Sequence, residues 1–133
     1  MIEQVLPGIH RIEVPLPRNP LQTLNSYFIR GHEKNLLIDT GFNQPECKAA
    51  INQAMQELDF HMENTDILVT HAHSDHTGLV HYLMTPSTEV FCDSYIEESL
   101  SIDQDAMWGY FKELNEQSGL RSVQSINGEF CRD

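Results

Sequence analysis

Residues 70–78, Thr-His-Ala-His-Ser-Asp-His-Thr-Gly, hold three histidines and one aspartate within six consecutive positions. The apolar run Ile67–Val69 precedes this segment and reads as a strand, and a helix is expected from about Thr77. Alternate residues of an extended segment point to the same side, so His71 and His73 can aim both imidazoles at one point. Asp75 and His76 follow just before the expected helix. We therefore predict that all four side chains face one cavity.

Four donors at this density favour a metal site over isolated structural residues. Imidazole and carboxylate donors suit zinc, with iron and manganese as alternatives. The spacing of His71 and His73 excludes the helical H-E-x-x-H arrangement, in which the histidines are four residues apart. Two alternatives stay open: Asp75 can be a simple helix N-cap, and a His-x-His pair can bind metal adventitiously. The remaining histidines are assigned structural roles: His10, His32, His61 and His81.

The pattern H-x-H-x-D-H followed by Gly78 resembles the metal-binding signature of the metallo-β-lactamase-fold hydrolases. That superfamily includes glyoxalase II-type thioesterases, lactonases and some nucleases. Asp39-Thr40-Gly41, which follows an apolar run, is similar to the superfamily's upstream D-T-G element. The resemblance covers roughly residues 6–92. It implies an α/β fold (α+β in some schemes): a mixed, largely antiparallel sheet with flanking helices, forming half of an αβ/βα sandwich.

The resemblance also implies a role for each residue of the motif. His71 and His73 bind a first divalent metal, zinc by preference, and Asp75 and His76 bind a second. Asp39 becomes a buried carboxylate that holds the metal loop in place, although alone it reads as a turn residue after a strand. A metal-bound water of lowered pKa is the nucleophile. Asp75 orients this water or accepts its proton.

Periodicity places the other elements around this loop. Strands are expected over residues 8–14, 23–30, 36–38, 67–70 and 88–92. Helices are expected over residues 45–58, from about residue 77 to Pro86, and over residues 94–118 in two pieces. Asn43 and Glu46 resemble a capping pair at the start of the first helix. Its apolar stripe, and that of the last helix, are assigned to core packing: Cys47, Ile51, Met55 and Leu58, then Met107, Tyr110, Phe111 and Leu114.

Length, charge and cysteine content set the class of protein. The 133 residues suit one domain, residues 1–133, taken as the N-terminal part of a metallo-β-lactamase-like domain. The net charge of −12 argues against a nucleic-acid partner and against a nuclease-type member of the superfamily. No apolar run approaches the roughly 18 residues of a membrane span, and no secretory signal is visible. We therefore expect no membrane association and a cytoplasmic location. The three cysteines are scattered, so we expect reduced thiols.

The pattern stops short of a complete catalytic domain. The resemblance implies a third histidine for the first metal and a bridging carboxylate for the second, but no histidine follows His81. The first hypothesis is a truncated metal-dependent hydrolase of an ester, thioester or lactone-type small molecule, with little or no activity as this chain. The alternative is a non-catalytic truncated module that acts through oligomerisation. A homodimer would then cover the apolar face left by the missing half.

Overall fold

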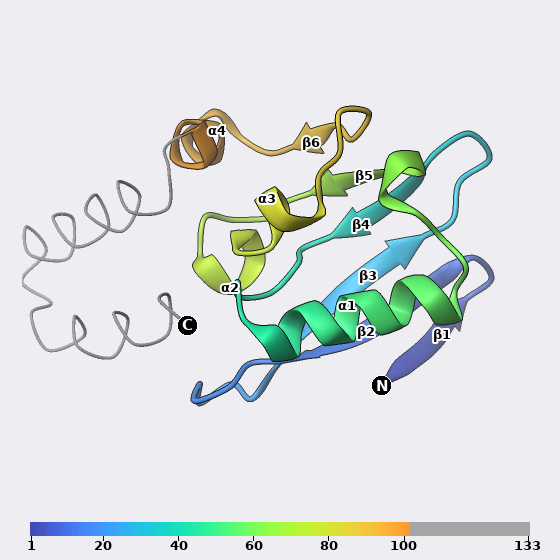
Figure 1. Cartoon of the computed structure of the whole chain (residues 1–133), viewed down its shortest axis with the longest axis horizontal. Coiled ribbons are helices and arrows are strands. Elements are labelled where there is room, and N and C mark those ends of the chain that lie inside the picture. Colours follow the sequence, from blue (N-terminus) through green and yellow to red (C-terminus); the bar gives the residue numbers. More distant parts are fainter. Residues whose placement is uncertain (102–133) are drawn as a thin grey trace, which may run out of the picture.

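The computed structural model describes the backbone of residues 1–101 and the side chains of residues 1–97. Six strands form one sheet in the order of the chain, β1-β2-β3-β4-β5-β6. Figure 1 shows α1 and α3 in front of this sheet. The strands are β1 (Ile2–Leu6), β2 (Ile9–Pro15), β3 (Thr23–Ile29), β4 (Asn35–Ile38), β5 (Thr65–Leu68) and β6 (Val90–Phe91). The helices are α1 (Pro45–Glu57), the 3-10 helix η1 (Met62–Asn64), α2 (Ser74–Thr77), α3 (Val80–Leu83) and α4 (Ser94–Ser101).

The type of strand pairing changes once along the sheet, from antiparallel to parallel. β1 to β4 pair antiparallel, whereas β4 pairs with β5, and β5 with β6, in parallel. A parallel pair needs a crossover connection, and α1 supplies it between β4 and β5, while α2 and α3 supply it between β5 and β6. The predicted α/β class with a mixed, largely antiparallel sheet is confirmed.

Helix α1 shows how the sequence sets the core. It begins at Pro45, whose fixed φ suits a first helical position. Its buried residues, Cys47, Ile51 and Ala54, recur at helical spacing, and the first two belong to the stripe predicted for this helix. The predicted capping pair is wrong, because the N-cap is Gln44 and its side chain makes no capping hydrogen bond.

One continuous apolar core lies on the helix-covered face of the sheet. Phe28 of β3 is fully buried, and its ring stacks on Phe60 with 4.1 Å between centroids. Burying a large apolar side chain stabilises a fold by roughly 1.5–3 kcal/mol, so this layer dominates the stability. The largest apolar side chains buried in it are Ile12, Phe28, Leu37, Ile51, Ile67, Leu79 and Ile96.

Several elements differ from the sequence prediction. Strand β6 covers only part of the expected residues 88–92, and the single helix expected from about residue 77 to Pro86 is two short helices, α2 and α3. Strand β1 was not predicted; four of its five side chains are exposed, so the sequence carries no clear inside–outside alternation there. Strand β5 begins and ends two residues earlier than expected, and the helix after it begins at Ser74 rather than Thr77. The predicted stripe of Met107, Tyr110, Phe111 and Leu114 lies outside the described residues. None of the helices within residues 1–101 has the length and apolar character of a membrane span.

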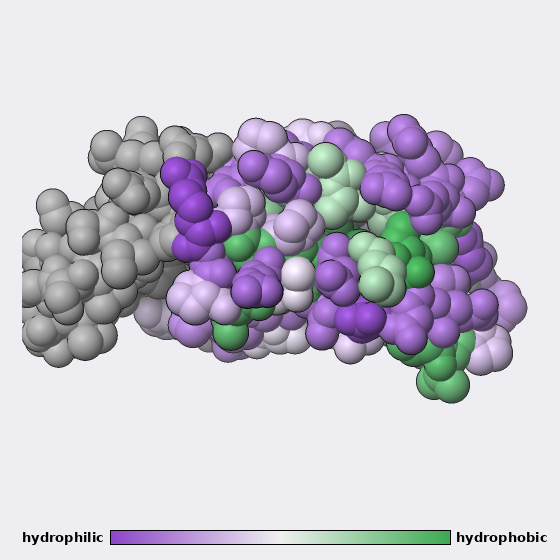
Figure 2. Space-filling view, turned by 90° about the horizontal axis from the view of Figure 1, so that it is seen from below, coloured by the Kyte–Doolittle hydropathy of each residue, from purple (hydrophilic) through white to green (hydrophobic). Residues whose placement is uncertain are grey.

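The opposite face of the sheet carries an apolar row across four strands. Cross-strand partners form this row: Tyr27 pairs with Ile38, Ile38 with Leu68, and Leu68 with Phe91. The first three side chains are half-buried and Phe91 is 49% exposed. We call these four residues the open-face row. Figure 2 shows the molecule from below, turned by 90° from the view of Figure 1, and the surface on that side is mostly hydrophilic with separate apolar patches.

Lys34, in the turn before β4, offers a test of how the parallel strands are tied together. Its Nζ donates to Asp66 Oδ1 of β5 at 2.7 Å and to the carbonyl of Ser87 at 2.6 Å. Burial alone would raise the pKa of Asp66, but hydrogen bonds from Lys34 and the Glu89 amide lower it. Replacing Lys34 by methionine should reduce the free energy of unfolding by about 0.5–1 kcal/mol at neutral pH.

The pH dependence of this difference follows from the sign of the pKa shift. A lowered folded-state pKa stabilises the fold above the unfolded-state value of about 3.9, and the stabilisation disappears as the pH falls through the folded value. Urea unfolding of both proteins at neutral and acidic pH measures it. A gap between wild type and Lys34→Met that persists below that range would contradict the assigned partner.

Candidate metal centre

The histidine-rich loop lies at the carboxyl end of β5. Because β4 and β5 are parallel, the residues that follow both strands meet at the same edge of the sheet. Asp39 follows β4, and its amide donates to the carbonyl of Leu68 at 2.9 Å. The topology therefore places the Asp39-Thr40-Gly41 segment beside the loop of residues 70–78, although about thirty positions of sequence separate them.

Asp39 accepts two hydrogen bonds from the start of the loop, one through each oxygen of its carboxylate. Oδ1 accepts the amide of Thr70 at 2.9 Å, and Oδ2 accepts the hydroxyl of Thr70 at 2.7 Å. The backbone of Asp39 is left-handed, with φ of 58°, and its carbonyl accepts the Ser26 hydroxyl at 2.8 Å. The residue is 5% exposed. Asp39 is therefore a buried carboxylate in direct contact with the loop.

The three imidazoles of the loop gather around His71. Its ring centroid lies 3.8 Å from that of His76 and 4.8 Å from that of His73. His71 and His73 are exposed, whereas Asp75 and His76 are half-buried. Burial, then the neighbouring His76 and His73, lowers the pKa of His71. The exposed imidazoles of His71 and His73 are accessible to a ligand that approaches from solvent.

His76 lies between two carboxylates. Its Nδ1 is 2.8 Å from Asp39 Oδ2 and its Nε2 is 3.4 Å from Asp75 Oδ2. Burial would lower the pKa of His76, but Asp39 and Asp75 more than offset it and raise that pKa to about 9. Burial would raise the pKa of the Asp39 and Asp75 carboxyls, yet contacts with His76 lower both pKa values. At Asp39, hydrogen bonds from Thr70 lower the pKa further. At neutral pH this arrangement is a cation held by two carboxylates.

Helix α2 is fixed to the segment after β4 through the carbonyl of His76. This oxygen accepts the amide of Thr40 at 3.0 Å and the hydroxyl of Thr40 at 2.8 Å. Thr40 Oγ1 in turn accepts the amide of Leu79 at 3.2 Å. Sequence reasoning assigned no role to Thr40 or Thr70. Their positions, inside the D-T-G segment and directly before the first histidine, were the available signal.

Asp75 and His76 belong to α2 rather than to a turn before it, because the helix begins at Ser74. The N-cap is His73, in an extended conformation, so the alternative in which Asp75 serves only as an N-cap is wrong. His73 thus directly precedes this helical turn, and His76 lies within it. An extended segment followed by one helical turn brings the motif's side chains toward one region.

The donor set fits a borderline divalent metal by its chemistry. It offers three imidazoles and one carboxylate, which are zinc-type ligands. A second observation is the buried Nδ1 of His76, which contacts Asp39 but makes no aligned hydrogen bond with it. Within residues 1–97, whose side chains are described, however, no three histidine, cysteine or acidic side chains are arranged to hold a metal ion. His76 is engaged by carboxylates, while His71 and His73 lie exposed beside it.

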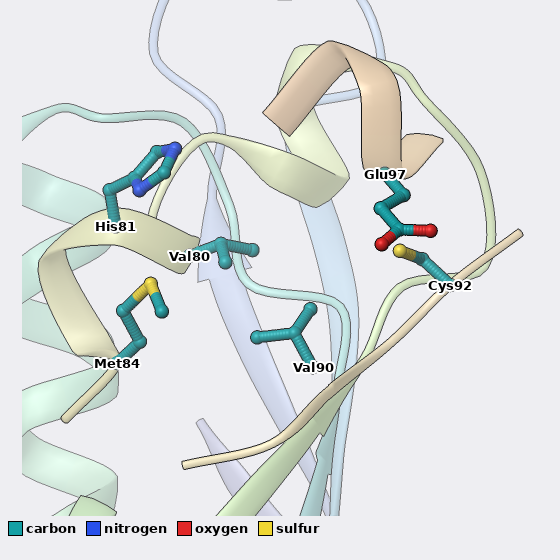
Figure 3. A pocket seen from close by; sticks show the side chains of 6 residues that line it. All are labelled: Val80, His81, Met84, Val90, Cys92 and Glu97. Carbon is teal, nitrogen blue, oxygen red and sulfur yellow. The ribbon is translucent and has the colours of Figure 1, made fainter. Parts of the chain in front are cut away.

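A separate hollow of about 320 Å³ lies beside α3 and β6. Figure 3 shows the thiol of Cys92 beside the carboxylate of Glu97, with His81 projecting from α3 and Met84 directly after that helix. Burial, then Glu97 and Asp93, raises the pKa of Cys92, so its thiol stays protonated and weakly nucleophilic at neutral pH. None of the predicted metal-binding residues lines this hollow. It is therefore distinct from the histidine cluster.

Comparison with known proteins agrees with this geometry. The family model described as the metallo-beta-lactamase superfamily matches residues 21–88, which include both the D-T-G segment and the histidine loop. An atrochrysone carboxyl ACP thioesterase, nsrC, from Aspergillus novofumigatus is 38% identical over 81 residues, covering 58% of this chain and 24% of that protein. A lactamase-like protein, ptaB, from Pestalotiopsis fici is 37% identical and covers the same shares of each.

A solved structure of a metallo-beta-lactamase family protein is also similar to this chain. A metallo-beta-lactamase family protein from Thermus thermophilus is 33% identical, with a TM-score of 0.56 over 60% of this chain and 27% of that one. The chain thus spans about a quarter of the length of the relatives it matches.

Proposed function

Since the chain belongs to the metallo-beta-lactamase superfamily, we propose that it forms the metal-binding part of a metal-dependent hydrolase. The observation that carries the proposal is the gathering of three imidazoles at the carboxyl end of β5, with ring centroids 3.8 and 4.8 Å apart. His71, His73, Asp75 and His76 would hold the metal, with zinc preferred over iron or manganese by donor type and up to two ions in a complete site. Superfamily members generally bind divalent metals.

Two acidic residues of this chain, Asp75 and Asp39, would prepare the site for hydrolysis. When bound, a divalent metal supplies the Lewis acidity that hydrolysis needs at neutral pH. Asp75 is ionised at neutral pH, because contacts with His76 lower its pKa against the effect of burial. Its carboxylate is thus able to accept a proton from a water molecule and is the catalytic residue we propose. Asp39 orients the loop through Thr70 and contacts His76.

We propose an ester or thioester as the substrate class. The support is the name of the relative nsrC, an acyl-carrier-protein thioesterase that is 38% identical over the matched segment of 81 residues. A lactone-type substrate uses the same carbonyl chemistry. Because the chain spans 24% of that relative, residues elsewhere in a longer protein would shape the substrate pocket, and we expect weak activity from these 133 residues alone.

Native mass spectrometry of the 133-residue chain with zinc, manganese or iron tests the proposal. We expect one or two metal ions per chain, lost in the double variant His71→Ala/His73→Ala. The double variant His32→Ala/His61→Ala is the matched control, since both of its histidines are exposed and lie outside the motif. It should keep the metal. Hydrolysis of a small acyl thioester by the loaded chain is the second readout. Equal metal counts in both double variants would place the site elsewhere.

The second candidate is a non-catalytic module that acts as a homodimer. Two observations favour it. Among the described residues, no three donors are arranged to hold a metal ion, and the open-face row presents apolar side chains, Phe91 being 49% exposed. Such a surface invites pairing with another sheet. In the same mass spectra, a dimer that takes up no added metal would support this candidate. A monomer that binds metal would support the hydrolase.

A further inference from the structure

We propose that Thr70 is a positioning residue that fixes His71 as the tautomer protonated at Nδ1 and leaves Nε2 with the free lone pair. The geometry that points to this is a chain of three groups: the Asp39 carboxylate, the Thr70 hydroxyl and the His71 ring. Its significance for metal binding rests on the proposed function, in which His71 is a ligand. The tautomer itself does not depend on that function.

The first step is the contact between Asp39 and Thr70. An ionised carboxylate has no proton to donate, so it can only accept hydrogen bonds. Asp39 Oδ2 lies 2.7 Å from Thr70 Oγ1, which means that the single hydroxyl proton of Thr70 points to Asp39. The amide of Thr70 donates to the other carboxylate oxygen at 2.9 Å. Two bonds to one carboxylate fix both the backbone and the side chain of Thr70.

The second step is the contact between Thr70 and His71. Thr70 Oγ1 lies 3.0 Å from His71 Nδ1. Because the only hydroxyl proton of Thr70 is already given to Asp39, its oxygen can act only as an acceptor toward the ring. The proton of this bond must therefore belong to His71 Nδ1. A neutral imidazole carries one ring proton, so Nε2 is left as an acceptor.

The consequence is a tautomer selected from the end of a neighbouring strand. A histidine ligand binds a metal through a nitrogen without a proton, and the hydrogen bond of the other nitrogen decides which one that is. The Thr70 hydroxyl is the hydrogen-bonding link between Asp39, which follows β4, and His71, which follows β5. A valine at position 70 would keep the branched shape and the amide bond to Asp39, but it would break the chain of proton donors.

Nitrogen NMR of the uniformly ¹⁵N-labelled, metal-free 133-residue chain tests the proposal. Two-bond ¹H–¹⁵N correlations distinguish the two tautomers of each ring. Spectra are recorded well above the usual imidazole pKa of about 6.5, where His71 is neutral. We expect the Nδ1–H form at His71 in wild type and in Thr70→Ser, which retains the hydroxyl. In Thr70→Val we expect that form to lose its dominance. The exposed ring of His61 is the internal reference and should not change.

Calorimetric titration with zinc gives a second, independent readout. Loss of a group that orients a metal ligand typically weakens metal affinity by about 10- to 100-fold, so we expect that loss in Thr70→Val and near wild-type affinity in Thr70→Ser. An Nε2–H ring at His71 in wild type, or one unchanged by Thr70→Val, would overturn the proposal even if zinc binds. If the tautomer responds as expected and zinc does not bind, the tautomer assignment at His71 stands and the proposed function fails.

Discussion

Replacing Asp39 by alanine is expected to lower the free energy of unfolding by about 3–5 kcal/mol, the usual effect of removing one partner of a buried charged pair. Asp39 is 5% exposed. Its carboxylate accepts hydrogen bonds from the amide and hydroxyl of Thr70 and lies 2.8 Å from Nδ1 of His76. Alanine removes the acceptor of both Thr70 donors, and a hydrogen bond to a charged group contributes about 1.5–3 kcal/mol. It also leaves the half-buried His76 without this neighbouring carboxylate. The left-handed backbone at this position, with φ of 58°, adds strain for alanine.

Asparagine at position 39 is the matched control. Its amide oxygen can still accept one bond from Thr70, and asparagine tolerates a left-handed backbone better than alanine. We expect a smaller loss, about 1–2 kcal/mol, because the charge and one acceptor disappear while the shape is kept. Urea unfolding followed by circular dichroism measures both variants. Equal losses for Asp39→Ala and Asp39→Asn would mean that the charge, not the acceptor geometry, stabilises the loop.

The two motifs at the site were visible in the sequence, but the contact between them was not. Each follows a short apolar run, which is enough to place it at the end of a strand. That the two strands are adjacent and parallel is a property of the sheet, set by the crossover through α1. Only this pairing brings Asp39 within 2.7 Å of the Thr70 hydroxyl. The resemblance suggested a buried carboxylate at Asp39, and the pairing explains why one is possible there.

The start of α2 shows why element boundaries were harder to predict. Apolar periodicity begins only at Leu79, so residues 74–77 carry no apolar signal for a helical turn. In the structure that turn is fixed by polar contacts, above all those of Thr40 with the carbonyl of His76. Such contacts leave no period in a sequence. The predicted cytoplasmic location and the lack of a nucleic-acid partner stay predictions.

Gly78→Ala is expected to destabilise the fold by about 1–3 kcal/mol, the usual effect of overpacking a well-packed region. A Cβ at Gly78 would lie 2.6 Å from the carbonyl oxygen of Gly41 and 2.8 Å from the amide nitrogen of Asn43. Both are backbone atoms of the segment after β4, so no side-chain rotation relieves the contact. Alanine would therefore push α2, with Asp75 and His76, away from Asp39.

The sign of this effect decides the explanation. The backbone of Gly78 is right-handed helical, with φ of −59° and ψ of −32°, so alanine suits its conformation. Without a steric contact, replacing such a glycine by alanine should stabilise the protein by about 0.4–1 kcal/mol, because the unfolded chain loses freedom. Urea unfolding separates the two cases, and zinc titration shows whether the displaced α2 also weakens metal binding. A more stable Gly78→Ala protein would mean that residues 41–43 do not press against this position. The glycine that follows the histidine motif would then need a different reason than close approach of two backbones.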